Sequence, residues 1–231
     1  MAKHVGIVGC SAEGAALCYR TLCMEAPRLM GEHCHPEVTV HTYPLSDYMV
    51  HIRSGAWEEV ANLMLSSAEK LQRAGADFAV CPDNTIHQAF DMVVDNSPIP
   101  WLHIAERVAQ EARDKGFRKL AVLGTKYLMT GPVYPDALGK FGIAYEIPAP
   151  DVREKIDAII FTELVNAVFT EKSRLCFNEV MDGLKALGCD AAVLGCTEIP
   201  LIVDPLDAPL PTLDSTRLLA RAALREALKQ G

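Results

Sequence analysis

The chain has 231 residues, of which 50% are hydrophobic and 23% are charged, and its formal net charge is −8. This composition is that of a folded globular protein, long enough for one large domain or two small lobes, and it argues against a disordered chain. The acidic excess and the lack of a clustered basic face argue against nucleic acid as a partner, because binding to a phosphate backbone depends on grouped Lys and Arg side chains.

The sequence predicts a cytoplasmic protein that does not cross a membrane. No apolar run reaches the roughly 18 residues that a membrane-spanning helix needs. The first residues, MAKHVGIVGCSAEG, contain an apolar run much shorter than the core of a secretion signal. The eight cysteines lie mostly in apolar segments, without the paired spacing of a disulfide framework, which indicates a reducing compartment.

Short apolar runs alternate with longer amphipathic segments, which is the pattern of βαβ units with a parallel sheet. The predicted strands span residues 4–10, 37–43, 77–81, 119–125, 142–147 and 190–196. Most of them are Val-rich and apolar without alternation, as in sheets covered on both faces. Apolar residues at helical spacing predict helices over 54–75, 100–116 and 214–231. For the first of these, Ser54 is the expected N-cap and Gly75 the expected end.

Two segments of the chain resemble each other: GADFAVCPDNT, which starts at Gly75, and GCDAAVLGCTE, which starts at Gly188. Both have an Asp two positions after the glycine, followed by an Ala-Val pair. The same count from each glycine reaches Asp83 in the first segment and Cys196 in the second. The acid and the cysteine are therefore expected at equivalent strand ends of two similar halves.

The predicted fold is α/β, with two pseudo-symmetric Rossmann-like lobes built on mostly parallel sheets. We expect an N-terminal lobe from residues 1–99 plus 207–231, which carries Asp83, and a C-terminal lobe from residues 100–206, which carries Cys196. In open α/β sheets, ligands bind at the carboxyl ends of the strands. The active site is therefore expected in the cleft between the two lobes.

Two proton-transferring groups on opposite walls of a cleft suit racemisation or epimerisation, in which a proton leaves one face of a carbon and arrives on the other. The α-proton of an amino acid is weakly acidic, so the base must lie within hydrogen-bonding reach and the developing charge must be stabilised. A cysteine acts in this role as a thiolate. The candidates for binding the substrate carboxylate are Ser11, within an anion nest after the first strand, and Asn84, Thr85, Thr125 and Thr197. Glu198 is either a cleft residue or a carboxylate favoured at a helix start.

Five short motifs carry a resemblance to a known family: NTIH (84–87), PWLHIA (100–105), LGT (123–125), EKIDAIIFTEL (154–164) and GCTEIP (195–200). In this order, along nearly the whole chain, they resemble the aspartate/glutamate racemases, which are cofactor-independent amino-acid racemases, and especially their broad-specificity branch. The resemblance implies two α/β lobes, a homodimer, no pyridoxal phosphate and no metal. It also implies one catalytic cysteine from each lobe, and Cys196 matches the second.

The chain departs from the family pattern at two positions. Asp83 stands where the family has its first cysteine. The family's aspartate-specific members have an Arg after the second strand that binds the distal carboxylate, and Tyr48 takes this position here, so a non-acidic substrate is expected. Lys155 resembles a lysine that members use near the substrate, and Arg53 is a candidate replacement for the missing cation.

The Asp–Cys pair has a chemical consequence. Reference pKa values of about 3.9 for Asp and about 8.5 for Cys differ by about 4.6, or about 6 kcal/mol. A resting enzyme would hold Asp83 ionised and Cys196 protonated, so it takes a proton at Asp83 and delivers one at Cys196, and the reverse direction needs the rarer state. Alternatively, Asp83 binds a substrate ammonium or hydroxyl group and Cys196 performs one-base chemistry.

The sequence therefore predicts a cofactor-independent amino-acid racemase with a small-molecule substrate, in which Cys196 and Asp83 are catalytic. Two other functions stay open: a one-cysteine decarboxylase or isomerase of the same superfold, and a non-catalytic small-molecule binding protein. The segment GEHCHPE (31–37) lacks the ligand spacing of a zinc site, so no metal is expected there. The segment GIVGCSAEG (6–14) does not match the dinucleotide fingerprint G-x-G-x-x-G.

Overall fold

A computed structural model describes residues 2–229 of the chain. These residues form two compact units, one from residues 2–104 with 216–229 and one from Ala105–Ser215. The sequence predicted boundaries between the two lobes at 99/100 and 206/207, and these lobe boundaries stay a prediction. The structure groups residues 100–104 with the first unit and 207–215 with the second. No helix within residues 2–229 is both long enough and apolar enough to cross a membrane.

The first unit contains a parallel four-stranded sheet. Its strands are β1 (Val5–Gly9), β2 (Val38–Thr42), β3 (Phe78–Val80) and β4 (Trp101–Leu102), in the spatial order β2-β1-β3-β4. Its helices are α1 (Ala12–Glu25), α2 (Pro27–Met30), α3 (Leu45–Ser54), α4 (Trp57–Arg73), η1 (Thr85–Ala89), α5 (Phe90–Val94) and α12 (Ser215–Ala227) from the end of the chain.

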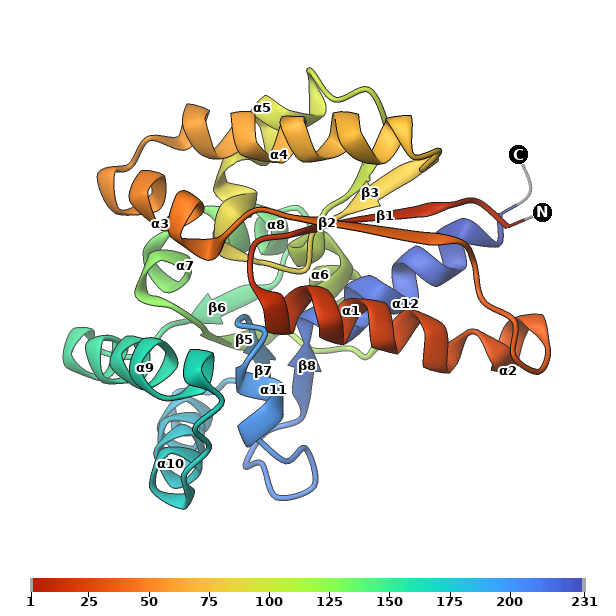
Figure 1. The fold of residues 1–231 in the computed structure, drawn as a ribbon. Coiled ribbons are helices and arrows are strands. Elements are labelled where there is room, and N and C mark those ends of the chain that lie inside the picture. The colour runs from red at the N-terminus through yellow and green to blue at the C-terminus, as the bar shows by residue number, and fades with distance from the viewer. Residues whose placement is uncertain (1, 230–231) are drawn as a thin grey trace. The chain divides into compact units, whose positions relative to one another are not determined.

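Both faces of this sheet are covered, as the non-alternating apolar runs predicted. Val5 and Ile7 of β1 pack with α1 and α12 in one buried cluster. On the other face, a Cβ atom at Gly6 would come within 3.0 Å of Leu71 in α4, so this helix lies directly on the strand. Figure 1 shows α4 on one side of β1 and β2, with α1 and α12 on the other.

The second unit repeats this architecture. Its strands are β5 (Lys119–Leu123), β6 (Ala144–Glu146), β7 (Ala191–Leu194) and β8 (Thr212–Asp214), all parallel, in the order β6-β5-β7-β8. Its helices are α6 (Ile104–Asp114), α7 (Lys126–Thr130), α8 (Val133–Gly139), α9 (Pro150–Thr162), η2 (Leu164–Asn166), α10 (Glu171–Ala186) and α11 (Ile199–Ile202).

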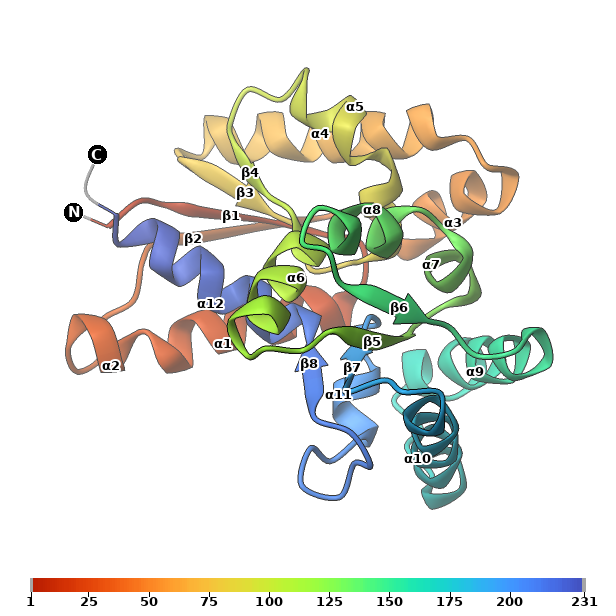
Figure 2. The ribbon, with the colours of Figure 1, turned by 180° about the vertical axis from the view of Figure 1, so that it is seen from behind.

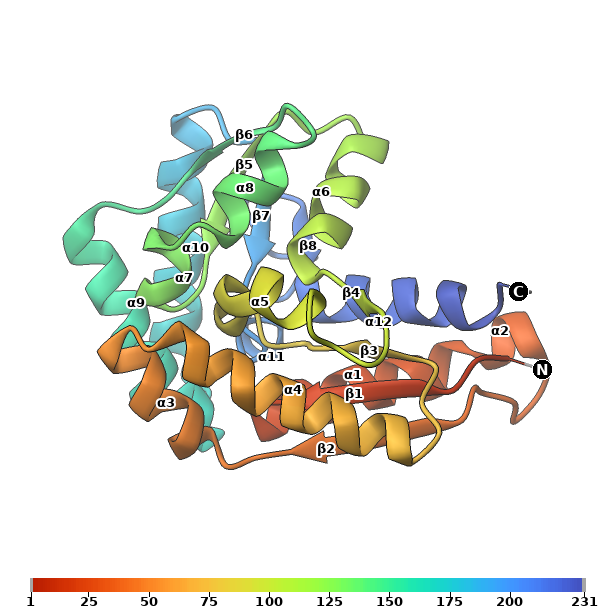
Figure 3. The same cartoon turned by 90° about the horizontal axis from the view of Figure 1, so that it is seen from above.

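The core of the second unit lies between its sheet and α9 and α10. Alternate residues of β5 and β7, among them Leu123 and Leu194, pack against Ile160 of α9 and Phe177 of α10. The other face is covered by α6 and α8, as Figures 2 and 3 show. The α/β fold class with two parallel sheets is thus confirmed.

The internal repeat of the sequence is a structural equivalence. Gly75 follows α4 with φ +95°, and Gly188 follows α10 with φ +90°, which is the left-handed region that favours glycine. Each glycine leads into the third strand of its unit, and the spatial order of the four strands is the same in both. Asp83 and Cys196 therefore follow equivalent strands.

The two repeated aspartates have the same structural role. The Asp77 carboxylate accepts a hydrogen bond from the backbone N–H of His4 at 2.6 Å, immediately before β1. The Asp190 carboxylate accepts from the N–H groups of Arg118 (2.7 Å) and Lys119 (3.2 Å), at the start of β5. In each unit, the aspartate fixes the start of the first strand beside the third.

One helix boundary differs from the prediction. A single helix was expected over 54–75 with Ser54 as its N-cap, but Ser54 is the last residue of α3 and its hydroxyl donates to the carbonyls of Val50 and His51. Gly55 ends α3 at φ +71°, and α4 begins at Trp57. The prediction was wrong because Ser54 belongs to the last turn of α3, a helix that was not predicted, and its hydroxyl is bound within that turn.

The strands β4 and β8 were not predicted. They have two and three residues, too few for a recognisable apolar run. Residues 100–116 were expected to be one helix, but its first residues form β4 and α6 starts at Ile104. Both missed strands lie at an edge of their sheet.

Candidate functional site

Asp83 lies just beyond the carboxyl end of β3, and its side chain is held by the loop that follows β1. Its Oδ2 accepts hydrogen bonds from the backbone N–H groups of Cys10 at 3.0 Å and Ser11 at 3.3 Å. These two N–H groups belong to the anion nest that was expected to bind a substrate carboxylate. In this chain they bind the protein's own carboxylate, which fixes Asp83 at the carboxyl edge of the sheet.

His87 fixes the backbone of Asp83. The N–H of Ile104 donates to His87 Nε2 at 3.3 Å, so the imidazole proton lies on Nδ1. Nδ1–H then donates to the Asp83 carbonyl oxygen at 2.9 Å. The imidazole is buried and stacks on Phe90. His87 thus positions Asp83 through its main chain.

The other predicted residues of the first unit have different surroundings. Ser11 caps α1, with its hydroxyl accepting from the N–H of Gly14 at 3.1 Å. Tyr48 is fully buried, and burial, followed by the charges of Cys81, Cys10 and Asp83, raises its pKa. Arg53 is exposed in the last turn of α3 and makes no ion pair within residues 2–229.

The next two predicted residues continue the Asp83 segment. Asn84 is buried, and Thr85 is the first residue of η1. Both follow Asp83, whose carboxylate accepts the N–H of Ser11, whereas Arg53 lies in the last turn of α3. The structure therefore groups Ser11, Asp83, Asn84 and Thr85. Tyr48 lies close enough for the charge of Asp83 to contribute to its raised pKa.

In the second unit, Cys196 follows β7 and faces a carboxylate of its own turn. Its thiol donates a hydrogen bond to Glu198 Oε2 at 2.9 Å, and the Thr197 hydroxyl donates to the same oxygen at 2.7 Å. Thr197 and Glu198 are buried. A thiol that donates to a carboxylate is a protonated thiol.

Thr125 lies at the same edge of this sheet, after β5. Its hydroxyl caps α7 by accepting from the N–H of Leu128 at 3.3 Å. The preceding residue, Gly124, approaches the residue before Cys196: a Cβ atom at Gly124 would lie 3.2 Å from the carbonyl oxygen of Gly195. Thr125 and Cys196 therefore follow two glycines that pack against each other.

Replacing Gly195 by alanine is expected to destabilise the fold and to displace Cys196. The added Cβ would lie 2.8 Å from the Leu123 carbonyl oxygen and 2.6 Å from a Leu128 methyl group. Overpacking of this kind costs about 1–3 kcal/mol. Urea denaturation measures the loss; Gly183→Ala, in open space on α10, is the control and should not destabilise. A Gly195→Ala protein of wild-type stability would contradict the close packing.

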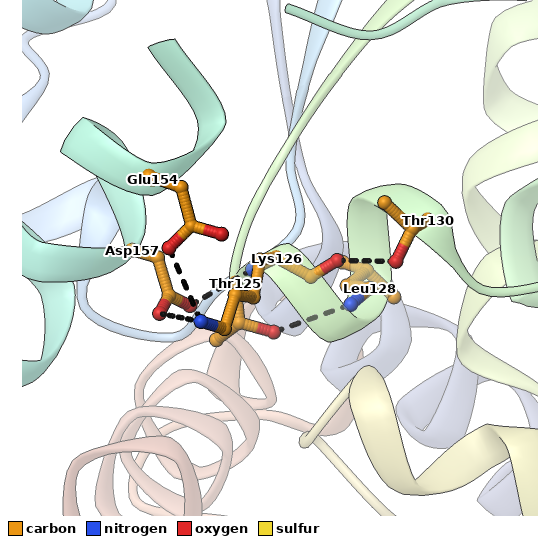
Figure 4. Close-up of polar contacts among 6 residues, drawn as sticks. All are labelled: Thr125, Lys126, Leu128, Thr130, Glu154 and Asp157. Carbon is orange, nitrogen blue, oxygen red and sulfur yellow. Dashed lines mark hydrogen bonds and ion pairs between the residues drawn. The ribbon is translucent and has the colours of Figure 1, made fainter. Parts of the chain in front are cut away.

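The loop after β5 is held by acids from α9, which sequence reasoning missed. Asp157 Oδ1 accepts the backbone N–H of Lys126 at 2.9 Å, and the Lys126 ammonium lies 3.1 Å from Glu154 Oε2 and 3.9 Å from Asp157 Oδ2. Figure 4 shows the lysine between the two carboxylates, with Thr130 donating to the Lys126 carbonyl. The hydrogen bond to Glu154 and the charges of both acids raise the pKa of Lys126.

A sequence signal for this cluster existed. Asp157 is the acidic residue between Ile156 and Ile160, which are both buried in the core. Lys155 was chosen from the same motif, but its side chain is directed to α10, where a hydrogen bond with Cys176 raises its pKa. Glu154 and Asp157, three residues apart, share the helix face toward Lys126.

No group of three or more His, Cys, Asp or Glu side chains is arranged to hold a metal ion within the part of the chain that is described. His33, Cys34 and His35 lie on an exposed loop after α2.

The cysteines differ in how readily they ionise. Burial, followed by the charge of Asp83, raises the pKa of Cys18 to about 12. The same two causes raise the pKa of Cys81 well above its ordinary value. Cys34 is exposed, and Cys196 is half-buried.

Thiol labelling is expected to follow this order. At pH 8, iodoacetamide should modify Cys34 first and Cys196 more slowly, and it should leave Cys18 and Cys81 unmodified, because alkylation requires an accessible thiolate. Peptide mass spectrometry reports the extent of modification at each cysteine. Unfolding in urea is the control, since it should expose all eight thiols. Modification of Cys81 before Cys196 would count against this environment for the two cysteines.

Comparison with known proteins places the chain in a family. The model of the Asp/Glu/Hydantoin racemase family matches residues 7–223. The chain belongs to this family. The family consists of racemases, so the enzyme class of the chain is that of an isomerase.

Three similar proteins cover most of the chain or nearly all of it. The broad specificity amino-acid racemase RacX from Bacillus subtilis is 21% identical over 190 residues, which are 82% of this chain and 81% of RacX. The crystal structure of a candidate Asp/Glu racemase from Yersinia pestis has a TM-score of 0.89 and 31% identity, over 98% of this chain and 100% of that one. An aspartate racemase homologue from Pyrococcus horikoshii has a TM-score of 0.85 and 26% identity, over 99% of this chain and 100% of that one.

Proposed function

We propose that this protein racemises an amino acid with protein side chains alone, by moving the α-proton between Asp83 and Cys196. The observation that carries the proposal is the internal repeat: Asp83 and Cys196 follow equivalent strands, β3 and β7, of two sheets with the same strand order. Membership of a racemase family supports the reaction type. RacX, described as a broad-specificity amino-acid racemase, supports an amino acid as substrate.

The proton balance of the step is complete within the two side chains. The Asp83 carboxylate takes the α-proton from one face of the substrate, and the Cys196 thiol gives its proton to the opposite face. The enzyme is left with a protonated Asp83 and a Cys196 thiolate. It returns to its resting state by exchange with solvent or by acting on the product enantiomer.

The resting state that this step requires is supported by the hydrogen bonds. Asp83 Oδ2 accepts two backbone N–H groups, as an ionised carboxylate does, and Cys196 donates to Glu198, as a protonated thiol does. The developing negative charge needs donors at the substrate carboxylate. Asn84, Thr85, Thr125 and Thr197 are the proposed donors, because they adjoin the two acid–base residues in sequence or at the sheet edge.

The remaining predicted residues have smaller parts in the proposal. Tyr48, buried beside Asp83, replaces the arginine that the resemblance assigns to aspartate-specific members, which favours a substrate that is not acidic. Lys155 and Arg53 stay predictions as substrate ligands, and the homodimer stays a prediction for solution measurement.

Exchange of the α-proton in deuterated water tests the proposal. The protein is incubated with each common amino acid, in both enantiomers, and the α-proton signal is followed by NMR, while chiral chromatography follows inversion. Loss of the signal together with inversion for one or a few amino acids is expected. Exchange without inversion would replace the two-base step by one-base chemistry. No exchange with any amino acid would overturn the proposal in favour of a one-cysteine enzyme of another reaction type or a binding protein.

A further inference from the structure

A pocket of about 430 Å³ lies within the second unit, between α7 and the first turns of α9. Lys126 and Tyr127 line it from α7, and Asp151, Arg153 and Glu154 line it from α9. The pocket follows β5 and β6, so it lies at the carboxyl edge of the sheet, where Thr125 and Cys196 also lie. None of the residues that line it takes part in the proposed proton transfer.

Both cations of the pocket are already bound to fixed acceptors. Arg153 Nη1 donates to the Pro148 carbonyl oxygen at 2.7 Å. The Lys126 ammonium lies between Glu154 and Asp157, as Figure 4 shows, and Asp157 also holds the Lys126 backbone N–H. Because Asp157 is only 12% exposed and makes both contacts, Lys126 stays in place if Glu154 turns to another partner.

The acids of the pocket are less engaged. Asp151 is exposed and makes no hydrogen bond or ion pair within residues 2–229. The side chain of Glu154 is 66% exposed, and its pairing with Lys126 is of the exposed kind that contributes little. Two cations, Lys126 and Arg153, thus meet three acids, Asp157 included, and the uncompensated charge is negative.

The aromatic ring in the pocket, like the negative charge, favours a cationic ligand. Tyr127 presents a ring in the lining, and the face of an aromatic ring attracts cations. The Lys126 ammonium is already 5.9 Å from the centre of this ring. A ligand cation would find the ring together with the carboxylates of Asp151 and Glu154.

We propose that this pocket binds the distal ammonium or guanidinium group of a basic amino-acid substrate. This inference rests on the proposed racemase function. With its α-carbon at Cys196, after β7, the substrate extends its side chain past β5 toward the loop after β6. Parallel strands lie about 4.8 Å apart, so this path crosses two strand spacings, about 10 Å, which a lysine or arginine side chain covers together with its hydrogen bond to the carboxylate of Asp151 or Glu154.

Lysine and norleucine test the inference as a pair, because norleucine has a straight apolar side chain that lacks the ammonium group. The α-proton exchange rate in deuterated water and the affinity by calorimetry are measured for both, and for glutamate. The variants are Asp151→Asn, Glu154→Gln and the two combined, which keep polarity and remove charge. Asp182→Asn, an exposed acid on α10 outside the pocket, is the matched control.

The wild-type protein is expected to favour lysine over norleucine. Each single variant should reduce that preference by about two- to fivefold and the combined variant by about tenfold. The exchange rate for norleucine should stay unchanged in these variants, and the Asp182→Asn control should keep the wild-type preference. An unchanged preference in the combined variant, or a preference for glutamate, would overturn the pocket and leave the racemase function standing. If no amino acid exchanges its α-proton, the racemase proposal is wrong. Lysine binding that the combined variant weakens would then still support the pocket proposal. An absence of lysine binding would contradict the pocket proposal as well.

Discussion

Replacing Cys196 by alanine is expected to abolish racemisation while the fold stays intact. The thiol is the proposed proton donor to one face of the α-carbon, and it is the proton donor of the hydrogen bond to Glu198 Oε2 at 2.9 Å. Positioned acid–base groups contribute about 10²- to 10⁴-fold to a rate, and neither Thr197 nor Glu198 can reproduce the thiol at the same atom. Chiral chromatography of both enantiomers measures the loss, and circular dichroism checks the fold.

Cys189→Ala is a matched control for this variant. Cys189 is buried in the core of the same unit, before β7, whereas Cys196 follows that strand, and Cys189 is not part of the proposed site. This protein is expected to keep racemase activity, with at most a modest loss of stability. Racemisation by the Cys196→Ala protein at a rate near that of the control would contradict the two-base mechanism.

The fold was predictable from the sequence because both faces of each sheet are covered. A strand that is buried on both faces is apolar throughout, as β1 and β7 are, and such a run is visible in the sequence. The strands β4 and β8 escaped because two or three residues at a sheet edge need no apolar run. The helix α3 escaped prediction, so Ser54, its last residue, was assigned to the start of the next helix.

The candidate site was predictable where the repeat marks it and not where side-chain direction decides. The repeat aligned Asp83 with Cys196, and both follow the third strand of their unit. Lys155 could not be placed from its motif, because successive residues on a helix point about 100° apart. Lys155 contacts α10, whereas Glu154, one residue earlier, faces Lys126. The nest after β1 looked open in the sequence because its occupant, Asp83, comes from a strand 73 residues away.

Replacing Asp83 by asparagine is expected to stop racemisation without stopping α-proton exchange. The asparagine oxygen can accept the same N–H groups, from Cys10 and Ser11, so the loop geometry is kept while the base is lost. Cys196, with Glu198 to take its proton, can still remove the α-proton from the enantiomer that faces it. A solvent deuteron then returns to the same face. NMR in deuterated water should show exchange for one enantiomer only, and racemisation should fall by about 10²- to 10⁴-fold.

The same variant separates the two roles that the sequence left open for Asp83. If Asp83 binds the substrate ammonium and Cys196 works alone, Asp83→Asn raises KM for both enantiomers and leaves the ratio of exchange to inversion unchanged. If Asp83 is the second base, that ratio rises sharply for one enantiomer, and Asp83→Cys should restore inversion, since a second thiol narrows a pKa gap of about 4.6. In that case, the N–H groups of the nest hold the Asp83 carboxylate in position to act as a base. Asp83 would then replace the cysteine that the family resemblance implies at this position, within the same two-base mechanism.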